Sequence, residues 1–178
     1  MELLREQVLV DQLTKLYNRR YLDDIGPKFS AQALRRKTTL GILMLDIDHF
    51  KQVNDTFGHN VGDIVIKTVA ALIKGAVRGS DIVVRYGGEE IVVILVDILA
   101  TKALDVAEKI RSEVERRPIE HPSGVLKKTV SIGVSEFPTN ADNFWQCVKY
   151  ADIAMYKAKT DGRNRAYVFS KDMLEDAK

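Results

Sequence analysis

Acidic side chains lie where the sequence predicts β-strands to end or turn. Asp46 lies near the end of an almost continuously apolar run, and Glu89 and Glu90 stand between two β-branched runs. Carboxylates brought together at strand ends repel one another unless a cation neutralises them. Oxygen ligands without histidine or thiolate suit a hard cation, Mg²⁺ first and Mn²⁺ second. Two such ions can hold phosphate oxygens, activate an attacking hydroxyl and stabilise a leaving group.

Gly87 and Gly88 precede the two glutamates. Paired glycines permit positive φ and let a phosphate approach the main chain closely. The alternative is a tight hairpin whose glycines make the bend and whose glutamates are merely solvated. Taken alone, these four residues favour the hairpin interpretation. If Asp46 lies beside the same turn, a metal and phosphate site is favoured instead.

The elements that must position these residues follow from the spacing of apolar positions. Strands are predicted over 39–47, 82–86, 91–96, 125–134 and 165–169, and helices over 63–77, 103–114 and 144–158. Nearer the N-terminus, Asn18 caps a helix over 19–24, and Gly26-Pro27 kinks or breaks it before a second helical piece through Arg36.

The order after the first helices is β-α-β-β-α-β, followed by an extra helix and strand. This is an α/β (α+β) ferredoxin-like core, the plan of polymerase palm domains. In this topology the third strand lies between the first two and runs antiparallel to the first. Asp46 and Asp48 should therefore lie beside Glu89 and Glu90, which favours a site.

A polar segment, DIDHFKQVNDTFGHNVGD, joins the first strand to the next helix. Within it Asn54 and Asp63 could recognise guanine, because an amide pairs with acceptor and donor edges and a carboxylate accepts from N1–H and N2–H₂. The alternative is an Asx turn at Asn54 and Asp55, with Asp63 in the first turn of the helix.

The chain resembles the GGDEF family, the diguanylate cyclases that condense two GTP into cyclic di-GMP with release of pyrophosphate. The resemblance rests on blocks that occur in family order and spacing: DQLTKLYNRR, DIDHFKQVNDTFGHNVGD, RYGGEEIVVIL, TVSIGVS and AMYKAKTDGRNR. It covers nearly the whole chain and implies a palm-like catalytic domain over 13–178. The one departure in the signature is Ile91, where the family usually has phenylalanine.

The resemblance also implies roles for individual residues. The implied metal ligands, for two Mg²⁺ per site, are Asp46, Glu89, Glu90 and the carbonyl of Ile47. Glu89 and Glu90 remain alternatives for the base that deprotonates the 3′-hydroxyl. The implied substrate contacts are Asn54, Asp63, His59, Phe50, Lys51, Gly87 and Gly88, with Lys159 and Arg163 holding the phosphates.

The resemblance further implies that each domain holds one GTP, so that two chains face each other as a homodimer. Residues 1–12 are then either an arm lying on the domain or the end of a helix from an upstream sensory module. Arg78 and Asp81 match the family's RxxD site, where cyclic di-GMP binds as an inhibitor, and Arg111 is a candidate second contact. The alternative for Arg78-Gly79-Ser80-Asp81 is an exposed helix-to-strand turn.

The composition limits the possible partners. The 27 Lys and Arg against 25 Asp and Glu leave a net charge of +2, which does not point to nucleic acid or membrane. Cys147 is the single cysteine, so disulfides within the chain and a cysteine-based zinc cluster are excluded. The sequence has no membrane-spanning run of about 18 apolar residues, and its first residues, MELLREQVLVDQL, are not expected to act as a signal peptide. We therefore expect a cytoplasmic domain.

Overall fold

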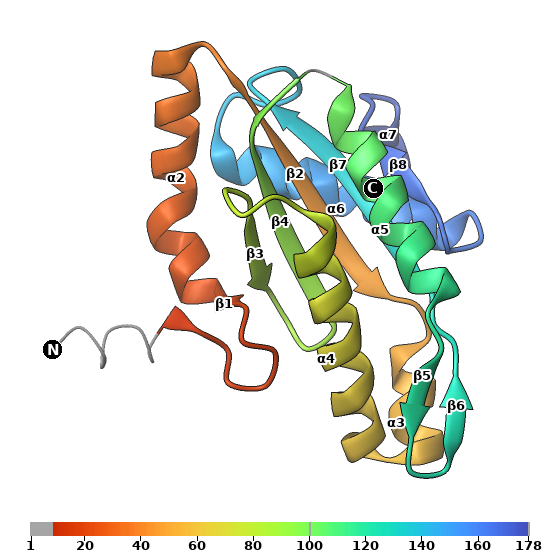
Figure 1. The fold of residues 1–178 in the computed structure, drawn as a ribbon. Helices are drawn as coiled ribbons and strands as arrows, with labels where there is room; N and C mark the ends of the chain where they lie inside the picture. Colours follow the sequence, from red (N-terminus) through yellow and green to blue (C-terminus); the bar gives the residue numbers. More distant parts are fainter. Residues whose placement is uncertain (1–8, 100, 178) are drawn as a thin grey trace, which may run out of the picture.

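The computed structural model describes residues 9–99 and 101–177, which build a mixed six-stranded sheet with helices on both faces (Figure 1). Across the sheet the strands are β1 (Tyr17–Asn18), β3 (Ile82–Arg85), β4 (Glu90–Ile98), β2 (Thr39–Ile47), β7 (Val130–Phe137) and β8 (Ala166–Val168). The predicted plan is confirmed, since β4 lies between β3 and β2. Residues 1–8 of the predicted N-terminal arm lie outside the described residues.

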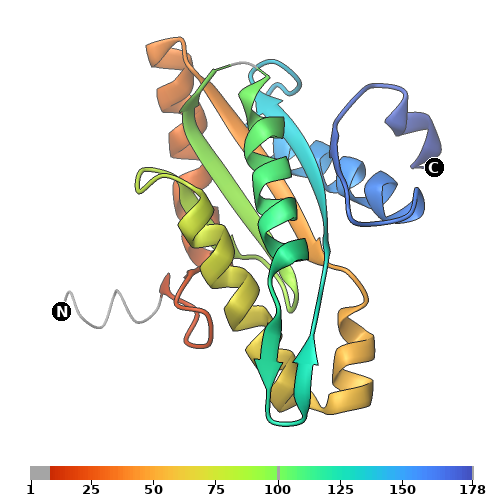
Figure 2. The same cartoon turned by 45° about the vertical axis from the view of Figure 1, so that its right-hand side comes forward.

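The helices form two layers, each with its own apolar core. One layer contains α4 (His59–Ala76) and α5 (Lys102–Arg116), with α3 (Phe50–Phe57) at its end. The other contains α2 (Arg19–Arg36) and α6 (Phe144–Thr160), and Figure 2 shows the two layers on opposite sides of the sheet. None of the described helices is both long and apolar enough to cross a membrane.

Strand β2 is buried on both faces, as its apolar sequence predicts. Its side chains alternate, so that Leu43 and Leu45 pack with α4 and α5 while Ile42 and Met44 pack with α2 and α6. Asp46 is two residues after Met44 and therefore lies on the same face of the sheet as Ile42 and Met44. The strand therefore delivers this carboxylate to the α2 and α6 side of the sheet.

Helix α2 runs continuously through Gly26-Pro27, so the predicted break into two helical pieces is wrong. Pro27 and Asp23 are exposed, and water can satisfy the carbonyl that loses its N–H partner. Ser30 Oγ also donates to the Pro27 carbonyl at 2.9 Å. Gly26 is required for packing, because a Cβ there would collide with the ring of Phe144.

Two further predictions need correction. The segment after β2 contains helix α3, and α4 already begins at His59, so neither the Asx turn at Asn54 nor a first-turn place for Asp63 is correct. The predicted strand over 125–134 is two strands, because β6 (Gly124–Leu126) pairs with β5 (Ile119–His121) in a separate hairpin. A short helix, α7 (Met173–Asp176), follows β8 and contacts α6.

Candidate active site

The register of β2 and β4 brings the predicted carboxylates together. Asp46 lies directly opposite Glu90 in the antiparallel pair. At the hairpin, the N–H groups of Tyr86 and Gly87 both donate to the Glu90 carbonyl, at 2.8 and 3.2 Å. The N–H of Ile47, the last residue of β2, donates to the Glu89 carbonyl at 3.4 Å. The turn is thus bonded to the strand that carries Asp46.

The glycines of the turn leave room for neighbouring groups and do not adopt a left-handed backbone. Neither Gly87 nor Gly88 uses the positive φ that glycine permits. A Cβ at Gly87 would lie 2.9 Å from a carboxylate oxygen of Glu90, while at Gly88 it would meet nothing within 4 Å. The turn therefore keeps one flank clear for the Glu90 side chain and another open to an incoming group.

Lys159 supplies the positive charge at this edge of the sheet. Its ammonium group donates to Asp46 Oδ2 at 2.7 Å, and Asp46 is 5% exposed. Burial raises the pKa of Asp46, Lys159 lowers it, and repulsion from Glu89 and Asp48 raises it further. Burial also raises the pKa of Glu90, with added repulsion from Asp46, Asp152 and Glu89. The net effect is a set of mutually repelling carboxylates that one lysine only partly neutralises.

The donor set suits a hard divalent cation. Asp46, Glu89 and Glu90 offer only oxygen atoms, and their mutual repulsion is the condition that such an ion relieves. Within residues 9–99 and 101–177, no three Asp, Glu, His or Cys side chains converge closely enough to hold an ion as they stand. An ion bound to Asp46 would compete with the Lys159 ammonium for the same carboxylate.

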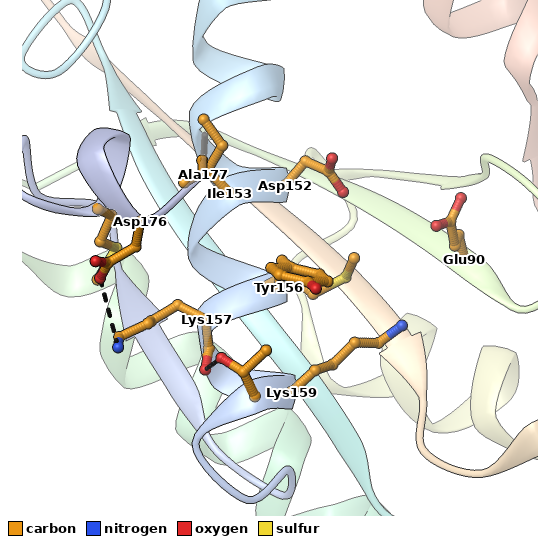
Figure 3. Close-up of a pocket in the computed structure, with 11 residues that line it drawn as sticks. Glu90, Asp152, Ile153, Tyr156, Lys157, Lys159, Asp176 and Ala177 are labelled. Atoms are coloured by element: carbon orange, nitrogen blue, oxygen red, sulfur yellow. Dashed lines mark hydrogen bonds and ion pairs between the residues drawn. The ribbon is translucent and has the colours of Figure 1, made fainter.

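A hollow of about 730 Å³ opens beside Glu90, between α6 and α7. Figure 3 shows Asp152, Tyr156 and Lys159 from α6 lining it, with Glu90 from β4 at the other side. Burial raises the pKa of Asp152, and Lys159 opposes that shift. The sequence argument missed Asp152, although a position seven residues before Lys159 on one helix shares its face and would have identified it.

The candidate guanine residues lie on neighbouring helices. Asn54 is in α3 and Asp63 in α4, and Asp63 is exposed. Asn54 Oδ1 is buried without a hydrogen-bond partner, against Gly62, where a Cβ would collide with it. An unpaired buried acceptor costs roughly 1–3 kcal/mol. Such an orphaned oxygen is consistent with a site that a ligand's N–H group completes. His59, exposed, begins α4.

The start of α3 borders the same edge of the sheet. His49 turns the chain with a φ of 54° and its side chain makes no cap hydrogen bond. The first amides of a helix favour an anion. Phe50 is buried and Lys51 exposed. Arg163 follows α6, in a turn where its N–H donates to the Ala158 carbonyl at 2.9 Å.

The predicted product site is only partly assembled. Asp81 is 4% exposed and accepts from the Arg78 N–H at 2.9 Å, the Arg78 guanidinium at 3.2 Å and the Val96 N–H at 3.0 Å. The Arg78 side chain is 57% exposed. The structure ties Arg111 to Glu108, Glu115 and Asn164. Arg78 and Asp81 are therefore together, whereas Arg111 is held by other partners.

Comparison with known proteins gives a consistent result. The family described as "Diguanylate cyclase, GGDEF domain" matches residues 8–165. Diguanylate cyclase DosC of Escherichia coli is 41% identical over 165 residues, which is 92% of this chain and 36% of that protein. Diguanylate cyclase A of Treponema denticola is 45% identical over 142 residues, 80% of this chain and 38% of that protein. The chain thus spans little more than a third of these relatives.

Solved structures with the same fold include two GGDEF domains. That of PA1120 (TpbB or YfiN) from Pseudomonas aeruginosa matches with a TM-score of 0.91 and 31% identity, covering 94% of this chain and 98% of that one. The coiled coil and GGDEF domain of DgcB from Caulobacter crescentus, in complex with c-di-GMP, has a TM-score of 0.88 and 35% identity, covering 94% and 88%.

Proposed function

Because the chain belongs to the GGDEF-domain family of diguanylate cyclases, we propose that it condenses two molecules of GTP into cyclic di-GMP and two of pyrophosphate. The observation that carries the proposal is the pairing of Asp46 with Glu90 across β2 and β4, with Lys159 bonded to Asp46. This arrangement suits phosphoryl transfer, in which positioning and charge do most of the work.

In each step the 3′-oxygen of one GTP attacks the α-phosphorus of the other. The bond to the bridging oxygen of the β-phosphate breaks, and pyrophosphate leaves with its electron pair. Glu89 or Glu90 would accept the proton of the 3′-hydroxyl. Asp46, Glu89, Glu90 and the Ile47 carbonyl would hold two Mg²⁺ ions, which supply charge stabilisation to the transferring group.

The remaining residues would bind and orient GTP. Asn54 and Asp63 would recognise the guanine edge, with His59 in the same segment. Lys159 and Arg163 would hold phosphate oxygens, and so would the backbone near Phe50, Lys51, Gly87 and Gly88. Each chain would hold one GTP, so a homodimer would bring the two substrates together. Because the curated relatives are longer, we propose that residues 1–12 connect domain 13–178 to an upstream sensory module.

Product binding at Arg78 and Asp81 would provide feedback inhibition. The exposed Arg78 guanidinium offers bidentate donors to guanine or phosphate, and the DgcB structures contain c-di-GMP. We expect Arg78→Ala to raise the product concentration needed for half inhibition by about tenfold, in line with the loss of one bidentate contact. Initial rates with added cyclic di-GMP measure this effect, and unchanged inhibition would argue against the site.

The direct test is to incubate the purified chain with GTP and Mg²⁺ and to identify the products by chromatography. Cyclic di-GMP and pyrophosphate in a 1:2 ratio are expected. Parallel reactions with ATP test the guanine specificity assigned to Asn54 and Asp63. Tight GTP binding without turnover would instead identify a nucleotide receptor and overturn the proposed activity.

A further inference from the structure

The turn after α6 has an unusual backbone. Gly162, Arg163 and Asn164 all have positive φ, at 125°, 63° and 47°. Left-handed backbone is uncommon for residues other than glycine, and two such residues in succession must be held by their surroundings. The groups that bind this turn therefore determine the backbone position of Arg163, from which its side chain extends.

Asp48 holds the turn from the sheet. One of its carboxylate oxygens accepts from the Asn164 N–H at 3.0 Å and from the Thr129 hydroxyl at 2.6 Å, and the other accepts from the Ser131 hydroxyl at 2.6 Å. Its own N–H donates to the Thr129 carbonyl at 2.9 Å. Asp48 is 2% exposed, so these bonds are shielded from water. It lies two residues after Asp46.

Arg111 holds the same turn from α5. Its guanidinium donates to Asn164 Oδ1 at 2.9 Å, and the Asn164 amide nitrogen donates to Glu115 at 2.8 Å. Glu108 and Glu115 accept from Arg111 at 2.9 and 2.7 Å and keep the guanidinium in place. Asn164 is thus bonded through its backbone N–H to Asp48, which follows β2, and through its side chain to Arg111 and Glu115 of α5.

From these contacts we infer that Asp48 and Arg111 are positioning residues that hold the Arg163–Asn164 turn and so fix Arg163 relative to Asp46. The inference rests on the proposed GTP-binding function, in which Arg163 binds phosphate. A guanidinium binds phosphate well only when its planar fork is correctly oriented, and small displacements of a charged group in a phosphoryl-transfer site lower the rate strongly. Arg111 acts through Asn164 and touches no substrate.

The test compares two probes in the presence of Mg²⁺ by titration calorimetry. 3′-Deoxy-GTP carries the triphosphate but lacks the attacking hydroxyl, and GMP lacks the β- and γ-phosphates. Arg111→Met, which keeps the aliphatic stem, and Asn164→Gly, which tolerates positive φ, are each expected to weaken 3′-deoxy-GTP binding about tenfold and leave GMP binding unchanged. Asp48→Asn is likewise expected to weaken 3′-deoxy-GTP binding.

A double-mutant cycle with Arg163→Ala decides whether the effect passes through Arg163. In the Arg163→Ala background, Arg111→Met should cause no further loss of triphosphate affinity. The control is Arg116→Met on the same helix, whose exposed guanidinium pairs with Glu113 and not with Asn164, and it should bind both probes normally. Thermal unfolding of each variant confirms that it is folded.

The inference alone would be overturned by normal 3′-deoxy-GTP binding to Arg111→Met, or by an equal further loss of affinity when Arg111→Met is added to Arg163→Ala. Equal weakening of GMP and 3′-deoxy-GTP would show a general structural defect and would also overturn it. If the wild-type chain bound neither probe, the proposed function itself would fail, and the inference with it.

Discussion

At the scale of single residues, the site is dominated by carboxylates with raised pKa values. Burial, then repulsion from Asp46, Asp152 and Glu89, raises the pKa of Glu90 above its ordinary value of 4.5. The folded chain therefore binds more protons than the unfolded chain between the two pKa values. The contribution of Glu90 to the stability of the metal-free protein consequently falls as the pH rises through that window, from about 4.5 upward.

Glu90→Gln should separate catalysis from stability. We expect turnover to fall at least about 100-fold, the usual lower limit for losing a catalytic acid or base. In EDTA the variant should melt at a higher temperature than the wild type at pH 8, with a smaller difference at pH 4, because the repelled charge is gone. Turnover assays and melting curves at the two pH values measure both effects. Near-normal turnover would refute the role given to Glu90.

The Lys159–Asp46 pair gives a prediction about metal. Lys159→Met leaves Asp46 buried without its cation, which should destabilise the metal-free protein by about 1–3 kcal/mol. Mg²⁺ should then stabilise the variant more than the wild type, because no ammonium competes for the carboxylate. Urea unfolding with and without Mg²⁺ measures the difference. Lys157→Met, whose partners are Asp161 and Asp176, is the control, and equal Mg²⁺ effects in all three proteins would contradict the prediction.

At the scale of elements, the sequence predicted those helices and strands that a local pattern of apolar or turn residues is sufficient to identify. The β-α-β-β-α-β order of the predicted elements gave the strand order, and that order placed Asp46 beside Glu89 and Glu90. The register that sets Asp46 directly opposite Glu90 comes from the structure. Helix α2 was mispredicted because Pro27 lies on its exposed face, which only the tertiary structure reveals. The bonds from Asp48 and Arg111 to Asn164 join three distant segments, so no local pattern could predict them.

Gly133 in β7 sets the spacing between α6 and the sheet. A Cβ there would collide with backbone atoms of Ala151 and Met155 in α6, and backbone cannot rotate away as a side chain can. We therefore expect Gly133→Ala to destabilise the protein by about 3 kcal/mol and to weaken turnover by moving Lys159. Chemical denaturation measures the first effect and product formation the second.

Gly75 is the matched control for Gly133. It lies in the exposed part of α4, where a Cβ would meet nothing within 4 Å. Gly75→Ala should stabilise the protein by up to about 1 kcal/mol through helix propensity and leave turnover unchanged. Equal unfolding midpoints for the two alanine variants would show that α6 is not held against β7 as closely as the structure indicates.

At the scale of the whole molecule, the Arg85 side chain joins Asp11, near the N-terminus, to the Gly87–Glu90 turn. Arg85 donates to both carboxylate oxygens of Asp11, at 3.1 and 3.2 Å, and to the Gly88 carbonyl, at 2.9 and 3.2 Å. Asp11 also accepts from the N–H and hydroxyl of Thr14, at 2.8 and 2.7 Å. A displacement of the segment that carries Asp11 can therefore reach the Gly87–Glu90 turn through the Arg85 guanidinium, in addition to the pairing of β1 with β3.

Asp11→Asn tests this connection. The neutral amide weakens the pair with Arg85, whose side chain and that of Asp11 are only 19% and 21% exposed, so the guanidinium gains freedom at its Gly88 end. We expect the amides of residues 86–89 to exchange with solvent faster and turnover to fall several-fold, a loss of about 1 kcal/mol of positioning free energy. Asp23→Asn on the exposed face of α2 should change neither quantity. Unchanged exchange at the turn in Asp11→Asn would mean that the N-terminal segment does not hold the hairpin, and any regulation through it would need another route.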